Sequence, residues 1–342
     1  MNASDVLNRL TYHKLRQGPF LDYLDHVDPK LALQVSGCGS WLHVREWELS
    51  GESRLRHANF CKRFLICPCC AARRASKLVT AYAGKVEVVQ DTRPELIPIM
   101  ITLTIRNGPN LPERLRHLKD SWTRMMNEKR KGASASSRNE PIEWNKVHGS
   151  VRAIEVTYNK KTGEWHPHIH VFALVSDYLS QAHLSAEWER FTGDSMIVDV
   201  RKCKNGIVSG LIEVLKYVSK PSELTPSQLY ELFECARGSR FVDPQGCMRG
   251  VPEPVIEQDD DDGLHGPFRD FIALWRGFGY SMESVSHRLE ILKPGDSGYG
   301  APRELVYLDP GEEDIFAGIA MPPEHLPPPR KYYADDMLVI DH

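Results

Sequence analysis

The chain has 342 residues, of which 41% are hydrophobic, and a formal net charge of −3. This length suffices for one or two buried cores. No apolar run reaches the roughly 20 residues of a membrane-spanning helix, and charges among the first 16 residues leave no apolar core for a signal peptide. We therefore expect a soluble protein of the cytoplasm.

The charge is distributed unevenly along the chain. Residues 251–342 carry a net charge of −12, whereas residues 1–250 carry +9. A basic body with an acidic tail is typical of a body that contacts nucleic acid. A solvated surface with a solubilising tail would give the same totals, so the charge alone leaves both interpretations open.

The first predicted elements are helices that flank a cluster of cysteines. Leucines among polar residues predict mostly helical structure over 1–35, and a further helix is predicted over 76–90. Between them, four of the eight cysteines crowd into ten positions within 36–75. In a chain without an export signal, such crowding favours metal binding over disulfides.

Alternating apolar residues predict a central hairpin in the next part of the chain. A strand over 97–105 precedes a helix over 111–130 and a polar loop. The turn residues 159–164 then join strands at 151–158 and 165–175. The later predicted elements are a helix over 180–191, a strand over 196–201, a helix over 207–220 that Pro221 ends, and an amphipathic helix over 265–277.

The hairpin contains a candidate metal site. His166, His168 and His170 share one face of their strand because side chains alternate between faces. If the loop 159–164 is symmetric, Glu155 lies directly opposite His168. Two imidazoles and a carboxylate with open positions suit Mg²⁺, Mn²⁺ or another divalent ion that also holds a phosphate. The alternative is a polar sheet face on which Glu155 bonds one histidine.

The helix over 207–220 contains a candidate nucleophile. Glu213 and Tyr217 are four residues apart and are therefore neighbours on its polar side. A phenol can attack a phosphodiester when a metal or base assists it, and Glu213 can activate a water. Lys216 and Lys220 can bind phosphates. An ordinary amphipathic helix with a half-buried tyrosine would give the same pattern.

These motifs, in this order, resemble the HUH endonuclease superfamily, and more closely the plasmid rolling-circle replication initiators with one catalytic tyrosine. The resemblance rests on a strand at 101–104, the segment HPHIHVF, and the helix segment EVLKYVSK, within about residues 36–250. It implies an α+β fold whose central antiparallel sheet has about five strands with helices packed on it. Glu155 matches the third metal ligand of the family, and Glu213 matches a glutamate found in one branch.

The resemblance also implies an activity. Tyr217 would nick one strand of a plasmid origin, single-stranded or in a hairpin, giving a 5′-phosphotyrosine and a free 3′-hydroxyl. Water activated by Glu213 would help to end the cycle by hydrolysis or strand transfer. His166 is interpreted as a DNA-contacting residue or as a support for the metal ligands. DNA is the expected partner, with a host helicase and DNA polymerase as further candidates.

The related initiators carry a similar cysteine pattern, from which we predict a structural zinc site. Its expected ligands are Cys38, Cys61, Cys67 and Cys70. Cys69 can replace any of these, and His57 can replace Cys38.

The sequence predicts five segments and leaves several alternative functions open. The segments are an N-terminal helical segment (1–35), a cysteine-rich zinc-binding element (36–90), an HUH nuclease domain (91–250), a C-terminal helical extension (251–293) and an acidic, proline-rich, irregular tail (294–342). Alternatives to an initiator are an HUH relaxase, a single-strand transposase, or a non-catalytic zinc-containing DNA-binding regulator. The position of the tyrosine after the histidines disfavours a relaxase.

Overall fold

The computed structural model describes residues 2–132, 142–203, 206–215, 224–259 and 264–285. They divide into two compact units, one within 1–61 and 257–342 and the other within 62–256. Among the residues that the structure describes, no helix is both long and apolar enough to span a membrane.

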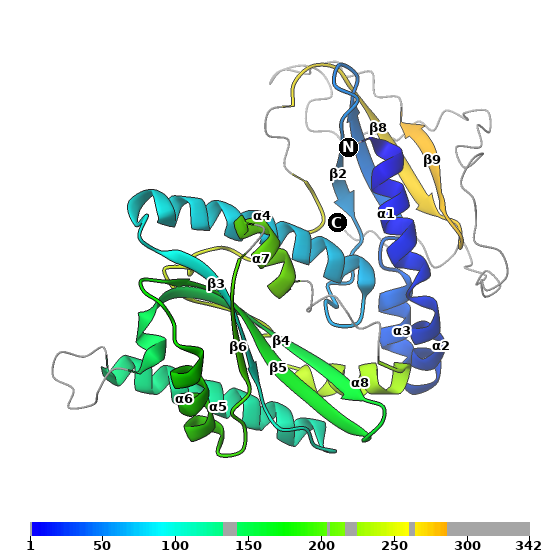
Figure 1. Cartoon of the computed structure of the whole chain (residues 1–342). Coiled ribbons are helices and arrows are strands. Elements are labelled where there is room, and N and C mark those ends of the chain that lie inside the picture. Colours follow the sequence, from blue (N-terminus) through cyan, green and yellow to red (C-terminus); the bar gives the residue numbers. More distant parts are fainter. Residues whose placement is uncertain (1, 133–141, 204–205, 216–223, 260–263, 286–342) are drawn as a thin grey trace, which may run out of the picture. The chain divides into compact units, whose positions relative to one another are not determined.

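The first unit combines three helices with a four-stranded antiparallel sheet (Figure 1). Its elements are α1 (Ala3–Leu15), α2 (Gly18–Val27), α3 (Pro29–Ser36), β1 (Trp41–Trp47), β2 (Ser53–Ala58), β8 (Phe268–Trp275) and β9 (Tyr280–Val285). The strand order is β2-β1-β8-β9, so β8 inserts a C-terminal segment beside an N-terminal strand. The helices confirm the prediction for 1–35. A capping box between Asn2 and Asp5 begins α1 by satisfying its first amides.

The predicted helix over 265–277 is wrong. Phe268, Phe271, Ile272 and Trp275 have helical spacing, but this segment forms β8, hydrogen-bonded to β1 on one side and β9 on the other. Within β8 the buried residues are Asp270 and Ala273 instead. The described part of the predicted helical extension over 251–293 therefore contributes strands.

The second unit is built on a five-stranded antiparallel sheet with the order β6-β3-β5-β4-β7. Its strands are β3 (Ile97–Thr104), β4 (Val147–Asn159), β5 (Glu164–Val175), β6 (Val198–Lys202) and β7 (Val242–Gly246). Its helices are α4 (Pro68–Thr92), α5 (Leu111–Gly132), the short η1 (Glu143–Lys146), α6 (Gln181–Thr192), α7 (Gly206–Leu215) and α8 (Pro226–Ala236). This sheet confirms the predicted α+β fold with about five central strands.

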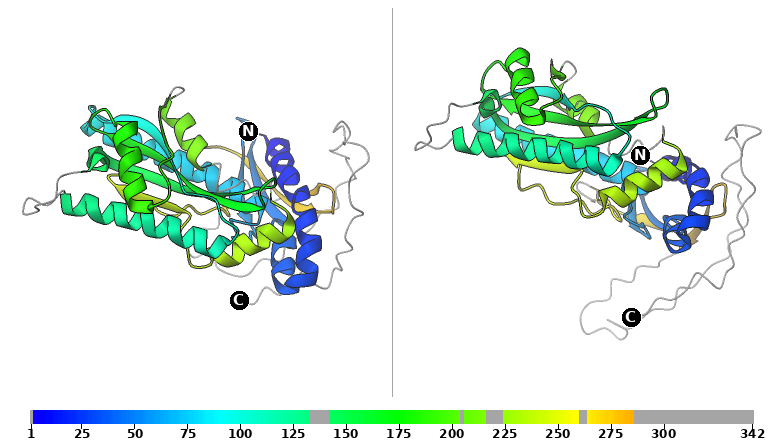
Figure 2. Two further views of the ribbon diagram at one scale, coloured as in Figure 1. Left: turned by 60° about the horizontal axis from the view of Figure 1, so that its bottom comes forward. Right: turned by 90° about the horizontal axis from the view of Figure 1, so that it is seen from below.

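Helices cover both faces of this sheet, and each face has its own core. Figure 1 shows α4 and α7 on one face and α5 and α6 on the other. Leu78, Val86 and Phe172 belong to the core beneath α4 and α7. Leu118 and Trp188 belong to the larger core beneath α5 and α6, which α8 extends where it packs beside α5 (Figure 2).

The β4–β5 hairpin has the predicted register. Tyr158 pairs with Trp165, and Glu155 pairs with His168. Gly163 closes the connecting turn with a φ of 72°, which glycine adopts without a side-chain penalty. The turn therefore fixes which residues of the two central strands face one another.

Candidate active site

Two histidines and a glutamate converge on the α4/α7 face of the central sheet. His168 and His170 lie two residues apart on β5, and Glu155 lies on the neighbouring strand β4. His168 Nε2 and His170 Nε2 both donate to Glu155 Oε2, the latter over 2.9 Å. One nitrogen of each ring and one carboxylate oxygen all lie within 4.8 Å of one another. The structure thus brings together the three predicted ligands.

The remaining imidazole nitrogens are held by groups on the same sheet. Thr102 of β3 pairs with His170, and its hydroxyl lies 3.2 Å from His170 Nδ1. His168 Nδ1 lies 3.3 Å from the carbonyl oxygen of His166. These contacts orient both rings so that Nε2 faces Glu155. Thr102 is not among the site residues predicted from the sequence, although it lies on the polar face of its predicted strand.

The cluster is largely buried, and burial changes its proton affinities. Burial alone would raise the pKa of Glu155, but hydrogen bonds from His168 and His170 outweigh it and lower that pKa to about 2. Burial lowers the pKa of His170, against the opposing charges of Glu155 and Glu213. Both shifts favour an ionised carboxylate beside a neutral imidazole, the protonation states in which these groups bind a metal.

Helix α7 lies directly on this face of the sheet. Leu211, Val214 and Leu215 are buried against it. A Cβ atom at Gly210 would lie 2.8 Å from Cys203 Sγ and 3.3 Å from the Phe172 ring, so any larger residue there requires one of these side chains or the helix to shift. Glu213 is half-buried on the same helix, and its charge acts on His170. The predicted residues Lys216, Tyr217 and Lys220 lie outside the described residues.

His166 occupies the same strand face, one step beyond His168. The two rings are 5.1 Å apart between centroids. Burial and the neighbouring His168 lower the pKa of His166, which leaves its ring neutral near pH 7. Its predicted contact with DNA stays a prediction.

The predicted zinc ligands form one pair in each unit. In the first unit, the Cys61 backbone amide donates to Cys38 Sγ over 3.4 Å. In the second unit, Cys67 caps the N-terminus of α4 and Cys70 lies in its first turn, both fully buried. The alternative ligand Cys69 is also buried, whereas the other alternative, His57, is exposed with its ring centroid 5.8 Å from that of His43.

The chain matches a known protein family over the segment that contains these residues. The family described as "Replication protein" matches residues 52–266, more than half of the chain. The chain belongs to this replication protein family. The match extends from β2 to the segment before β8 and includes His168, His170 and Glu155. The predicted membership of a replication protein family is therefore confirmed.

Three curated relatives, each named "Protein rep", are similar to this replication protein. One from Streptococcus pneumoniae serotype 2 (strain D39 / NCTC 7466) is 30% identical over 56% of the chain and 60% of its own length. One from Bacillus amyloliquefaciens is 25% identical over 72% of the chain and 82% of its own length. One from Staphylococcus aureus is 26% identical over 64% of the chain and 94% of its own length. The chain thus spans less than two thirds of the Streptococcus relative. No solved structure matches the chain.

Proposed function

We propose that this replication protein initiates rolling-circle replication of a plasmid by nicking one strand of its origin. The observation that carries the proposal is the convergence of His168 and His170 on Glu155 beneath α7, the helix that ends at Leu215. Two histidines and a carboxylate on a rigid sheet form a metal-binding set, and Tyr217, two positions after the last residue of α7, supplies a phenol.

The donor set fits a catalytic divalent ion. Glu155, His168 and His170 would hold Mg²⁺ or Mn²⁺, with Thr102 and the His166 carbonyl orienting the rings. Three protein ligands leave coordination positions open, as a site that also binds a phosphate requires. When bound, the metal would withdraw charge from a phosphate oxygen and help the phenol to ionise.

The protein residues would then perform an exchange of phosphoesters. The Tyr217 phenol loses its proton, and its oxygen attacks the scissile phosphorus. The bond from phosphorus to the 3′ oxygen breaks, and that oxygen takes up a proton. The products are a 5′-phosphotyrosine and a free 3′-hydroxyl, which would prime a host DNA polymerase. Lys216 and Lys220 would neutralise neighbouring phosphates.

Glu213 would act at the end of the cycle. Its carboxylate would take a proton from water, whose oxygen attacks the phosphotyrosine and releases Tyr217. The half-buried position of Glu213 on α7 and its effect on His170 support this role. We expect Glu213→Ala to retain the first nick and to accumulate the covalent adduct.

We further propose that Cys38, Cys61, Cys67 and Cys70 bind one structural Zn²⁺. Four thiolates form a closed tetrahedral site that leaves no position for a substrate. The adjacent Cys38 and Cys61 in one unit, and Cys67 and Cys70 on one helical turn in the other, support this assignment. Origin DNA would be the partner of the assembled protein, and a host helicase would act on the nicked origin.

A covalent-trapping experiment tests the proposed function. The purified protein is incubated with Mn²⁺ and single-stranded oligonucleotides that tile its plasmid origin, and adducts are separated under denaturing conditions. We expect one oligonucleotide to form an adduct with the wild type and none with Tyr217→Phe or His168→Ala. DNA binding without any adduct would reject the nicking enzyme in favour of a non-catalytic regulator.

A further inference from the structure

A pocket of about 540 Å³ opens beside the metal site of the second unit. Its lining includes Thr104, which pairs with the ligand His168, and His166 on the same face of β5. The rest of its wall comes from the loop after β3 and the loop between α6 and β6. The pocket is therefore continuous with the row of histidines and large enough for a small organic group.

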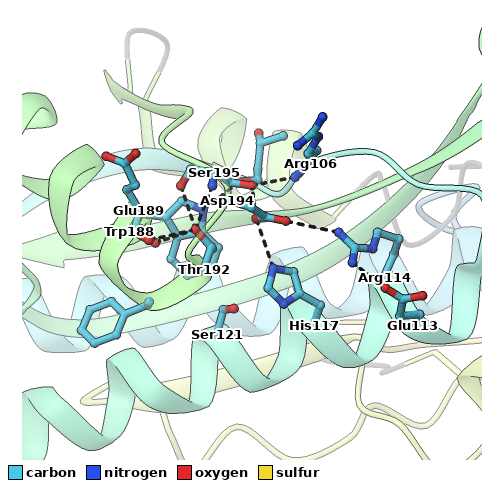
Figure 3. Close-up of polar contacts among 12 residues, drawn as sticks. Arg106, Glu113, Arg114, His117, Ser121, Trp188, Glu189, Thr192, Asp194 and Ser195 are labelled. Atoms are coloured by element: carbon cyan, nitrogen blue, oxygen red, sulfur yellow. Dashed lines mark hydrogen bonds and ion pairs between the residues drawn. The ribbon is translucent and has the colours of Figure 1, made fainter.

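A buried hydrogen-bond network fixes the two loops to each other. The Arg106 backbone amide donates to Ser195 Oγ over 2.7 Å, and Ser195 Oγ donates to Asp194 Oδ1 over 2.6 Å. Thr192 Oγ1 bonds both the amide and the carbonyl of Ser195. Figure 3 shows these contacts on one side of the loop, with the Arg106 side chain extending away from them. The pocket wall is thus held in place before anything binds.

The same network compensates the charge of Asp194, one of the two acidic residues that line the pocket. The Asp194 carboxylate lies 3.3 Å from Arg114 Nη1 and 3.2 Å from His117 Nε2, both on α5 (Figure 3). Those contacts and the Ser195 hydroxyl lower the pKa of Asp194 although its burial would raise it. The Asp194 carboxylate is therefore compensated by the Arg114 guanidinium, which weakens its repulsion of an anionic ligand.

The open side of the pocket has one cationic side chain, Arg106, and an exposed apolar surface formed by Met196 and Ile197. Met196 and Ile197 are 58% and 67% exposed, an unusual exposure for two adjacent large apolar residues. Arg106 is exposed, and within the described residues its guanidinium makes no hydrogen bond or ion pair. Glu164, at the start of β5, adds a hydrogen-bond acceptor to the lining.

We propose that this pocket binds one unpaired nucleotide of the DNA strand beside the scissile phosphate. The base would lie on Met196 and Ile197, Arg106 would bind the adjoining phosphate, and Glu164 would accept a hydrogen bond from an N–H group on the edge of the base. A nucleotide combines an apolar face, a polar edge and an anion, which matches this lining. The proposal rests on the proposed function, because the metal site defines which strand passes the pocket.

Salt-dependent binding of single-stranded DNA tests the pocket without requiring cleavage. The affinity of the full-length protein for fluorescent dT20 is measured in EDTA between 50 and 200 mM salt. Loss of one phosphate contact in Arg106→Ala should reduce the slope of log affinity against log salt by about 0.7. The double variant Met196→Ala, Ile197→Ala should bind about 5- to 20-fold more weakly with an unchanged slope.

Matched variants on other surfaces of the same unit serve as controls. Arg116 is exposed on α5, the face opposite the histidines, and Val88 is 61% exposed on α4. Arg116→Ala and Val88→Ala should leave slope and affinity unchanged, and all variants should unfold at the wild-type temperature. If the slope of Arg106→Ala equals that of Arg116→Ala, or if the double variant binds with wild-type affinity, the pocket does not bind a nucleotide. A wild type that binds dT20 but forms no covalent adduct would instead overturn only the nicking function.

Discussion

His168 and His170 are oriented by the nitrogens that do not face Glu155. Thr102 holds one ring and the His166 carbonyl the other, so neither ring can turn without losing a hydrogen bond. A sheet of five paired strands carries all four groups, and this rigidity suits the proposed metal site.

Replacing Glu155 by glutamine tests the metal set at a single atom. Glu155→Gln keeps the size of the side chain but removes the charge that both imidazoles face. We expect Mn²⁺ affinity, measured by calorimetry, to fall by at least about 100-fold, and nicking to be lost with it. Glu87→Gln, at an exposed position on α4, is the control. Equal Mn²⁺ affinity in both variants would exclude Glu155 as a ligand.

A second buried carboxylate stabilises the first unit. Asp270 is 4% exposed and accepts from Arg45 Nε over 2.8 Å and from Arg45 Nη2 over 2.9 Å. His43 Nε2 lies 3.3 Å from it. Burial alone would raise the pKa of Asp270, but these partners outweigh it and hold the pKa well below its usual range.

The lowered pKa predicts the pH dependence of stability. The ionised Asp270 stabilises the fold above its unfolded-state pKa of about 3.9, and this contribution is lost as pH falls toward the lower folded pKa. Asp270→Asn should lose about 3 kcal/mol at pH 7 because it removes the carboxylate that accepts from Arg45 in a buried pair. Urea unfolding should show the difference between wild type and variant shrinking below pH 4. A difference that stays constant down to pH 2 would contradict the assignment.

At the scale of elements, the hairpin was predictable because its register is a local property. A symmetric six-residue turn fixes that Glu155 opposes His168, and no distant part of the chain can change this pairing. The misassigned β8 depends on distant partners instead. Asp270 is buried because Arg45 and His43, more than 200 residues earlier, neutralise it, and no local pattern contains that information.

The candidate site is also only partly predictable from local sequence patterns. The three ligands follow from alternation and register, but the nucleotide pocket requires loops at 105–107 and 194–197 to meet. Their contact depends on the Arg106 amide and Ser195, which lie 89 positions apart in sequence. Hydrogen bonds of this kind leave no periodicity, so the pocket becomes visible only in three dimensions.

The close approach of α7 to β5 gives a prediction at this scale. The added methyl group in Gly210→Ala would press on the Cys203 thiol and the Phe172 ring and force α7 or these side chains to shift, although alanine is the better helix former. Because a shift of about 1 Å can cost about 100-fold in rate, we expect nicking to slow by up to about 100-fold while binding of dT20 is retained. Gly84→Ala on α4, where an added Cβ meets nothing within 4 Å, is the control. An unchanged nicking rate in Gly210→Ala would show that the position of α7 does not affect the reaction.

At the scale of the whole molecule, the chain crosses between its two units more than once. The first unit takes strands from both ends of the described chain, while the second is continuous in sequence. The predicted cysteine ligands are divided between the units at the first crossing. If all four bind zinc as proposed, the free energy of zinc binding adds to the stability of the folded protein.

Metal analysis of the purified protein tests the proposed zinc site. We expect one zinc per chain in the wild type, less than half of that in Cys67→Ser, and a melting temperature lower by roughly 5–10 °C. Cys235→Ser changes a half-buried thiol outside the predicted set and should retain the zinc. Full zinc content in Cys67→Ser would remove that cysteine from the ligand set.

Mapping the covalent bond tests the central claim of a tyrosine nuclease most directly. After reaction with Mn²⁺ and the cleaved oligonucleotide, the protein is digested with protease and nuclease, and its peptides are sequenced by mass spectrometry. We expect one 5′-linked nucleotide on Tyr217 in the wild type, at higher yield in Glu213→Ala and absent from His170→Ala. A nucleotide on another residue, or cleaved DNA with no protein attached, would contradict the account.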